Sequence, residues 1–281
     1  LWAVRCHLHL IAGRAQDQLT FDLQVEVAER IGYADHGGRR GVEHFMQDYF
    51  RHATQVGELT RIFLTAMEAA HLKPEPRLIG LLRGARARRR KLKPVFTLKH
   101  DMRRDPEATR IFLDLLLKHG NPERGLRRMN ELGALAAFIP EFAPVVAMMQ
   151  FNMYHSYTVD EHTIQVVSTL AQIEREELIE ELPIASGILK AGVNRKVIYL
   201  ACLIHDLGKG RPEDHSVLGA QLARRICPRL GLKPDEAETV EWLVRHHLLM
   251  SDMAQKRDIA DPRTVRDFAK AVKTIARLDL L

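Results

Sequence analysis

Aromatic residues, cysteine and long apolar runs are all scarce in this chain. Aromatic side chains make up 6% of its 281 residues, and alternating strand patterns are nearly absent, so a β-sheet protein is not expected. The three cysteines, Cys6, Cys202 and Cys227, are widely spaced and odd in number. They argue against a disulfide framework and fit a reducing compartment such as the cytoplasm. No run of about 18 apolar residues occurs, so no transmembrane helix is expected.

The start of the sequence also lacks an initiator methionine and a signal-peptide pattern. It reads Leu1-Trp-Ala-Val-Arg-Cys-His7, with no charged segment leading into an apolar one. We therefore expect a piece of a longer chain whose true N-terminus is missing. The hydrophobic content of 46% is enough for a large core and for more than one packed unit.

Positive charge is in excess and gathers in one segment. The net charge is +6, and much of the excess lies in the arginine- and lysine-rich residues 83–93. Such a run could bind a nucleic acid or an acidic partner. No aromatic residues are interleaved with it and no nucleic-acid motif accompanies it, so we expect a solvated linker or a docking segment instead.

Helical spacing runs through the sequence and predicts an all-α protein. Residues 1 to about 33 are expected to form a helical hairpin that ends at Gly32. One long helix is expected over 41–72, with a buried stripe formed by Phe45, Tyr49, His52, Val56 and Leu59. On this stripe, His52 is expected to be a packed core histidine and not a ligand.

Prolines interrupt residues 72–97, which also carry the basic run, and predict a domain boundary or linker there. The expected organisation is a helical region over 1–100, connecting helices over 101–157 and a second domain over 158–281. The helix starts expected after this boundary carry capping residues. They are Asp105 before Pro106, Thr158 in a capping box with Glu161, Asp214 before His215, and Asp261 before Pro262, which is expected to start the final helix.

The pair His205-Asp206 is the most informative feature of the sequence. It follows the apolar helical stretch from Arg195 and precedes Gly208, which could end that helix. An apolar helix has no structural use for two ligand-type residues at its end unless something binds them. The pair therefore predicts a buried metal site.

Further candidates lie at helix ends or on apolar stripes: His162, His215 and His247, with Asp258 following. Imidazole and carboxylate ligands without paired thiolates suit divalent transition metals at a site that can hold two ions and a bridging water, not a structural zinc site. Such a site suits phosphodiester hydrolysis. Lys209 could hold a phosphate oxygen, or could be a cation that completes a helix C-terminus.

The order of His162, His205-Asp206 and Asp258 resembles the HD superfamily of metal-dependent phosphohydrolases. The match extends to the bifunctional uridylyltransferase/uridylyl-removing enzymes of bacterial nitrogen regulation, and it covers nearly the whole chain. The segments that carry it are Leu19-Thr-Phe-Asp-Leu-Gln24, Phe45-Met-Gln-Asp-Tyr-Phe-Arg-His-Ala53, Tyr154-His-Ser-Tyr-Thr-Val-Asp-Glu-His-Thr163, His205-Asp-Leu-Gly-Lys-Gly210, Asp214-His-Ser-Val-Leu-Gly-Ala220, His247-Leu-Leu-Met-Ser251 and Arg257-Asp-Ile-Ala-Asp-Pro262.

This resemblance implies an activity, a metal and a partner. The activity is removal of UMP from a tyrosine of the PII signal protein when glutamine is abundant. Mn²⁺ or Mg²⁺ is the implied metal, as one or two ions, although an imidazole-rich site would also take Fe²⁺ or Zn²⁺. The implied minimal ligands are His162, His205, Asp206 and Asp258, with His215 and His247 extending the site to a second ion. We expect His155 and His246 to lie outside the ligand set.

Two parts of such enzymes have no counterpart in the sequence. The Gly-Ser turn and paired aspartates of the transferase site are missing, so no UMP transfer is expected. The ACT domains that would sense glutamine are missing as well, so glutamine control is expected to be lost or altered. The alternative interpretations are an HD phosphohydrolase that acts on a free nucleotide or cyclic dinucleotide, and a non-catalytic helical docking module.

Overall fold

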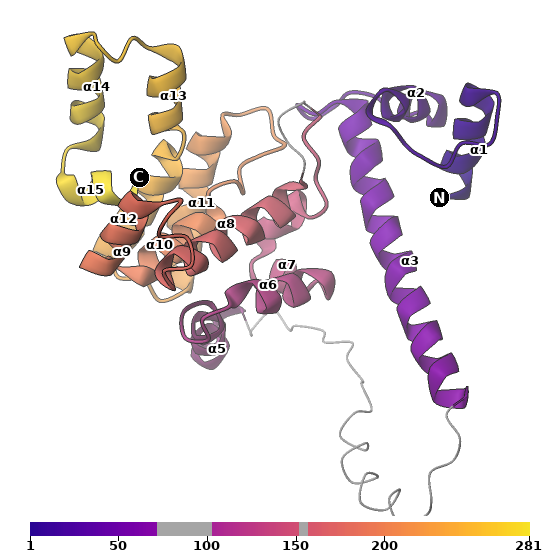
Figure 1. Cartoon of the computed structure of the whole chain (residues 1–281), viewed down its shortest axis with the longest axis horizontal. Helices are drawn as coiled ribbons and strands as arrows, with labels where there is room; N and C mark the ends of the chain where they lie inside the picture. Colours follow the sequence, from indigo (N-terminus) through magenta and orange to yellow (C-terminus); the bar gives the residue numbers. More distant parts are fainter. Residues whose placement is uncertain (72–102, 152–156) are drawn as a thin grey trace, which may run out of the picture.

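The structure, a computed structural model, describes residues 1–71, 103–151 and 157–281 (Figure 1). These residues form helices and loops without a β-strand, apart from one isolated bridge between His36 and Arg39. The predicted all-α class is thus confirmed. Among the helices of the described part, none combines the length and apolarity needed to cross a bilayer. The expected boundary at 72–97, the basic run and His155 lie outside the described residues.

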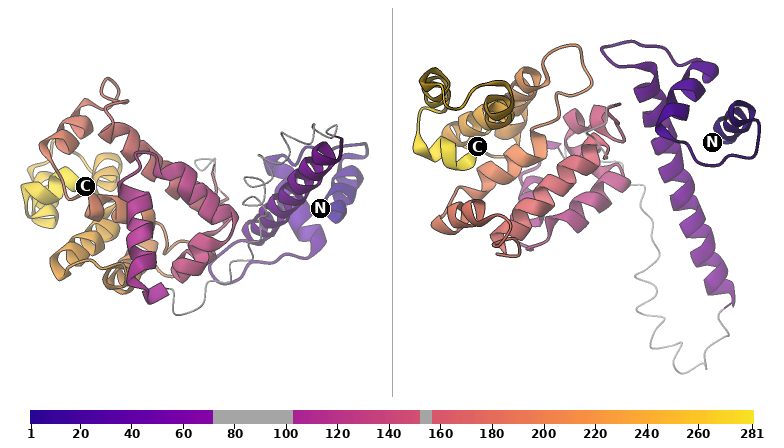
Figure 2. Two further views of the ribbon diagram at one scale, coloured as in Figure 1. Left: turned by 90° about the horizontal axis from the view of Figure 1, so that it is seen from below. Right: turned by 45° about the horizontal axis from the view of Figure 1, so that its top comes forward.

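Two groups of helices lie on opposite sides of the molecule in Figures 1 and 2. The smaller group comprises α1 (Trp2–Ala12), α2 (Phe21–Ile31) and α3 (Gly41–His71). The larger group comprises α5 (Pro106–Leu117), α6 (Pro122–Glu131), α7 (Ala134–Phe138), the 3-10 helix η3 (Pro140–Val145), α8 (Val159–Glu174), α9 (Pro183–Ala191), α10 (Arg195–Ile204), α11 (His215–Arg229), α12 (Pro234–His246), α13 (Leu249–Lys256), α14 (Pro262–Val272) and α15 (Ile275–Leu280).

The N-terminal group has a small core of its own. Its α2 packs against both α1 and α3, and Gly32 ends α2 in the left-handed conformation, with φ at 98°, where glycine is favoured. The predicted helical hairpin is confirmed. The buried members of this core are Val4, Leu8, Val27, Ala28, Val42, Phe45 and Met46.

Only the first part of α3 is buried. Phe45 lies in the small core, but His52 is exposed, and the exposed fractions of Val56 and Leu59 are 47% and 66%. The predicted buried stripe is therefore wrong beyond Tyr49, and His52 is not a packed core histidine. The physical reason is that no described element covers this part of the helix (Figure 1).

The larger group shares one core that runs from Phe112 to Val244 in the sequence. Its central helices are α8, α10, α11 and α12, which pack on one another, and α6 covers α8. Residues of the predicted connecting range 101–157 contribute to the same core as those of 158–281. The three-part division itself stays a prediction.

Aspartate caps start three helices of this group as predicted. The Asp105 carboxylate accepts from the Glu107 backbone N–H at 2.8 Å, the Asp214 carboxylate from two N–H groups at the start of α11, and the Asp261 carboxylate from the N–H of Arg263 at 2.8 Å. Each bond satisfies a helix N–H that has no partner within the helix. Helix α14 starts at Pro262 as predicted but is not the final one, since α15 follows.

The capping box predicted at α8 is wrong in its bonding. Thr158 occupies the N-cap position in an extended conformation, but its hydroxyl makes no capping hydrogen bond. The Glu161 carboxylate instead pairs with Arg127 of α6. That interhelical ion pair draws the carboxylate away from the backbone N–H that the capping box required.

Side chains of α3 join the two groups. The Gln47 amide donates to the carbonyl oxygens of Pro144 and Val146, at 3.0 and 2.8 Å, and the Phe151 N–H donates to the Glu43 carboxylate at 2.9 Å. Gln47 is buried, so its hydrogen bonds are shielded from water. The N-terminal group is thereby anchored beside the start of α8.

Candidate metal centre

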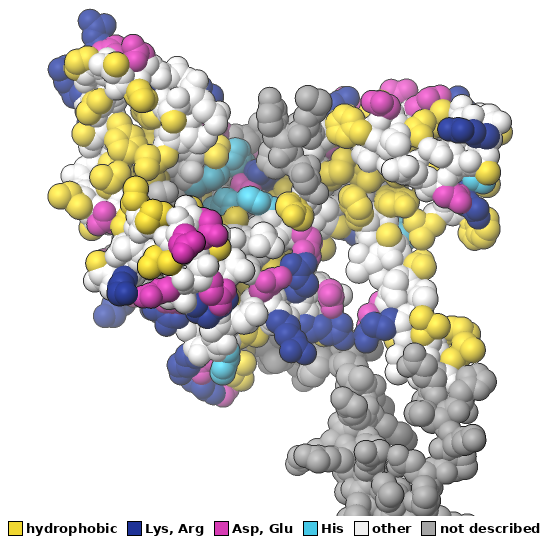
Figure 3. Space-filling view, in the orientation of Figure 1, with side chains coloured by type: hydrophobic (Ala, Val, Ile, Leu, Met, Phe, Trp, Pro, Cys, Tyr) yellow, Lys and Arg dark blue, Asp and Glu magenta, His cyan; other side chains and the backbone are white. Residues whose placement is uncertain are grey.

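Five of the predicted ligand residues meet in one cluster. His162 lies in the first turns of α8, and His205 and Asp206 directly follow α10. His215 is the first residue of α11, and His247 is the C-cap residue of α12. Figure 3 shows histidine side chains gathered on one face of the molecule. Four helices thus contribute to one site, although their ligands are far apart in the sequence.

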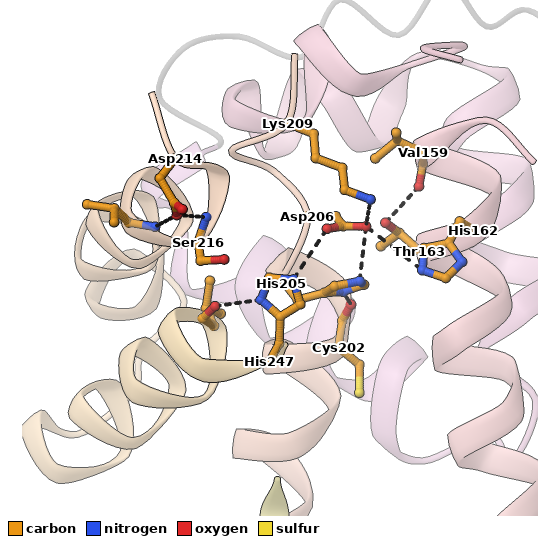
Figure 4. Close-up of polar contacts among 12 residues, drawn as sticks. Val159, His162, Thr163, Cys202, His205, Asp206, Lys209, Asp214, Ser216 and His247 are labelled. Carbon is orange, nitrogen blue, oxygen red and sulfur yellow. Dashed lines mark hydrogen bonds and ion pairs between the residues drawn. The ribbon is translucent and has the colours of Figure 1, made fainter. Parts of the chain in front are cut away.

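Asp206 is the centre of this cluster (Figure 4), with a side chain that is 2% exposed. Its Oδ2 atom lies 3.2 Å from His205 Nε2 and 3.8 Å from His162 Nε2. Its Oδ1 atom lies 3.7 Å from His247 Nε2. The two carboxylate oxygens therefore face different histidines.

These contacts divide the cluster into two overlapping groups, His162 with His205 and Asp206, and Asp206 with His215 and His247. In each group one ligand atom from every residue lies within 4.8 Å of the others. Ligands bound to one ion at about 2.1 Å lie roughly 3–4 Å apart. The geometry fits one divalent ion in each group, with Asp206 shared between them.

Two polar atoms in the cluster are left without a protein partner. Asp206 Oδ1 and His215 Nε2 are both buried, and neither has a hydrogen-bond partner among the described residues. A buried polar atom without a partner costs free energy. A metal ion would satisfy both atoms, so the residues present fit the divalent metal expected from the sequence.

Backbone carbonyls orient two of the rings. His205 Nδ1 donates to the Cys202 carbonyl at 2.7 Å, and His247 Nδ1 donates to the Val244 carbonyl at 2.7 Å. Because a carbonyl oxygen only accepts, Nδ1 carries a proton, and Nε2, which faces Asp206, is the atom that a metal ion would bind. Burial lowers the pKa of His247 and of His215, which favours the neutral imidazole that binds metals.

The central carboxylate is held in its charged form. Burial acts to raise the pKa of Asp206, but the hydrogen bond and charge of His205 and the Lys209 ammonium outweigh it and hold that pKa well below its ordinary value. Lys209 Nζ lies 2.8 Å from Asp206 Oδ2. Since α10 already ends at Ile204, Lys209 does not complete that helix, and its contact with a phosphate oxygen stays a prediction.

Close backbone packing sets the position of His215. A Cβ atom added at Gly208 would overlap the His215 carbonyl oxygen and lie 2.9 Å from the Gly219 nitrogen. Gly208 does not end α10, which stops four residues earlier at Ile204; instead it lets the loop after Asp206 contact α11 directly. The sequence contains one signal for this close contact. Gly219 lies inside α11, where a glycine is unfavourable unless close packing requires it.

Two other predicted positions lie outside the cluster. Asp258 is exposed in the loop between α13 and α14, where its carboxylate accepts from the Ala260 N–H at 2.9 Å, and it belongs to neither group. Its predicted role as a minimal ligand is not supported by this geometry. The His246 ring packs on Trp242 with centroids 5.0 Å apart, also away from the cluster.

Comparisons with known proteins agree with this geometry. The HD domain profile matches residues 159–281. The profile described as the uridylyltransferase GlnD third domain matches residues 46–138, and that of the GlnD PII-uridylyltransferase matches residues 1–64. The HD match begins at the first residue of α8 and includes every member of the histidine–aspartate cluster.

Three relatives in other bacteria share one description. Proteins of Cereibacter sphaeroides and Ruegeria pomeroyi, both described as bifunctional uridylyltransferase/uridylyl-removing enzymes, are each 62% identical to this chain over its whole length. A protein of Azospirillum brasilense with the same description is 44% identical. The chain spans 35% or 36% of the length of these relatives. This chain belongs to the family of bifunctional uridylyltransferase/uridylyl-removing enzymes and contains its HD domain.

Proposed function

We propose that this HD domain is a metal-dependent phosphodiesterase that removes UMP from a tyrosine of the PII signal protein. The observation that carries the proposal is the buried Asp206 carboxylate with a different set of histidines at each of its oxygens. The relatives' description as uridylyl-removing enzymes supports the choice of substrate. PII is accordingly the proposed partner.

His162, His205 and Asp206 would hold one ion, and Asp206, His215 and His247 a second. A bound divalent ion supplies Lewis acidity and a hydroxide-like water at neutral pH. We propose Mn²⁺ or Mg²⁺ as the metal in the cell, while the imidazole-rich ligand set would also accept Fe²⁺ or Zn²⁺.

The protein residues position the reacting groups. His162 is more exposed than His205, His247 and Asp206, with 41% of its side chain accessible against 2% for Asp206, so the substrate approaches from the side of α8. The backbone carbonyls of Cys202 and Val244 hold two rings in fixed orientations. Lys209 places a positive charge beside the site, where it stabilises the charge that develops on a phosphoryl oxygen.

We propose that this chain hydrolyses but does not transfer UMP. Its sequence contains no Gly-Ser turn with paired aspartates of the kind that would hold Mg²⁺ and UTP.

The direct test is UMP release from uridylylated PII by the purified chain with added Mn²⁺. The account predicts release that is abolished by a chelator and restored by Mn²⁺. Release from a free uridylyl ester but not from uridylylated PII would contradict the substrate and favour an HD phosphohydrolase of free nucleotides. No hydrolysis of either compound by metal-loaded protein would favour the docking module.

Adjacent histidines provide a matched pair of variants. His247→Ala removes a ligand of the second group. We expect the rate of UMP release to fall by about 100-fold, the upper end of the range typical for losing a residue that orients a metal ligand. His246→Ala removes the neighbouring ring, which packs on Trp242 outside the cluster, and should retain the wild-type rate. Equal losses in both variants would contradict the assigned site.

A further inference from the structure

A cavity of about 180 Å³ lies beside the metal centre, where the two groups of helices meet. One side is formed by the loop between α2 and α3, with Gly38 and Arg39, and another by the loop after Asp206, with Gly210 and Arg211. Lys209 and His215 line the cavity as well. Lys209 contacts Asp206 and His215 belongs to the metal cluster, so the cavity borders that site.

Glycines hold the two loops together. A Cβ atom added at Gly38 would lie 2.8 Å from the Pro212 nitrogen, and one added at Gly210 would lie 3.3 Å from Arg39 Cδ. The aliphatic part of Arg39 therefore rests on Gly210, whose φ of 77° also favours glycine. Through this contact a residue of the N-terminal group reaches the edge of the HD site.

The charge of Arg39 is incompletely compensated. Its guanidinium donates to the Gln47 side-chain oxygen at 2.8 Å and to the Glu43 carbonyl at 3.2 Å, but Nε is buried and has no described partner. The guanidinium makes no ion pair within the described residues. Burial lowers the pKa of Arg39, and the charges of Glu43 and Asp48 offset only part of that effect.

Two carboxylates, Glu43 and Glu213, also line the cavity. Both oxygens of Glu43 accept backbone N–H groups, from Phe151 at 2.9 Å and from Arg40 at 3.0 Å. Arg211 makes no hydrogen bond or ion pair with the described part of the chain. Arg39 and Arg211 thus line the cavity without an ion-pair partner among the described residues, and an anion bound between them would be stabilised.

We propose that this cavity binds the phosphoryl group of the nucleotide, with Arg39 and Arg211 as positioning residues. The inference rests on the proposed function, since it names the group that the hydrolase site holds. The phosphodiester would lie between the metal cluster and the two guanidinium groups. After hydrolysis the nucleoside monophosphate would carry an additional negative charge and would bind there as product.

The test is UMP binding to the metal-free chain, measured by calorimetry in a chelator, so that neither metal nor turnover contributes. We expect binding by the wild type, and at least a tenfold weaker affinity for Arg39→Gln and for Arg211→Gln. Arg39→Lys should recover most of the affinity, because it retains the charge. Inorganic phosphate should compete with UMP, whereas uridine should not.

Arg40→Gln is the matched control. It removes the same charge one position away, from a side chain that packs over the Phe151 ring and does not line the cavity, and its UMP affinity should equal that of the wild type. Equal affinities in wild type, Arg39→Gln and Arg211→Gln would overturn the inference, as would binding of uridine as tight as that of UMP.

The UMP-binding test and the test of PII deuridylylation can fail independently of each other. UMP binding that depends on Arg39, without hydrolysis of uridylylated PII, would support the anion site and refute the deuridylylase. Hydrolysis with a UMP affinity that does not depend on Arg39 or Arg211 would support the deuridylylase and refute the anion site. Arg211→Gln changes a side chain without described hydrogen bonds, so its folding should be unaffected, and circular dichroism checks this.

Discussion

Asp206→Asn is expected to reduce kcat/KM for UMP release by about 1000-fold or more, equivalent to about 4 kcal/mol of transition-state stabilisation. The amide keeps the shape of the side chain but removes its negative charge and one of its two acceptor oxygens. Since Asp206 is shared by both ligand groups, one substitution weakens both proposed ions. Steady-state kinetics on uridylylated PII with saturating Mn²⁺ measure the effect.

The same substitution leaves Lys209 buried beside a neutral group, so part of the loss could come from instability. His162→Gln separates the two causes, because the more exposed His162 ring contributes to the first group alone. It should lose activity while retaining the wild-type melting temperature. Wild-type rates in a folded Asp206→Asn protein would contradict the role assigned to the carboxylate.

Gly208→Ala is expected to destabilise the fold by about 3 kcal/mol, at the upper end of the typical range for overpacking. The added methyl group would overlap the His215 carbonyl oxygen, which is backbone and cannot rotate away. Relieving the overlap would move His215 and the loop that carries Asp206, so activity should fall as well. Urea unfolding measures the free energy of unfolding.

Gly187→Ala is the control for this substitution. Gly187 lies within α9, and nothing stands within 4 Å of an added Cβ atom. Alanine has the higher helix propensity, so the free energy of unfolding should rise by about 0.5–1 kcal/mol. Destabilisation of similar size at both positions would mean that the close contact of Gly208 with α11 is not the cause.

The parts of the site that the sequence predicted are those whose signal is local. His205 and Asp206 stand out because they end an apolar helix, and His215 because Asp214 caps the helix that begins there. The packing of α10 and α11 against α12 then brings these residues together. Asp258 lacks such a local signal. It follows α13, a helix with no buried residue. Without hydrophobic periodicity in that helix, the sequence does not predict the direction of the loop that carries Asp258.

Features that depend on contacts between distant segments could not be predicted in the same way. Arg39 lies next to Arg40 in a polar loop, and only the folded chain shows that Arg39 alone rests on Gly210. The exposure of the second half of α3 could not be predicted from the sequence either. Its apolar stripe has the same spacing as a buried one, and burial depends on whether another element covers it.

The measurement that tests the account most directly is the divalent metal content of the purified chain after saturation with Mn²⁺ and removal of free ion. The account predicts retained, stoichiometric metal in the wild type and in His246→Ala, and its loss from Asp206→Asn. A folded wild-type chain that retains no divalent metal, or an Asp206→Asn chain that retains as much as the wild type, would contradict a metal centre built around Asp206.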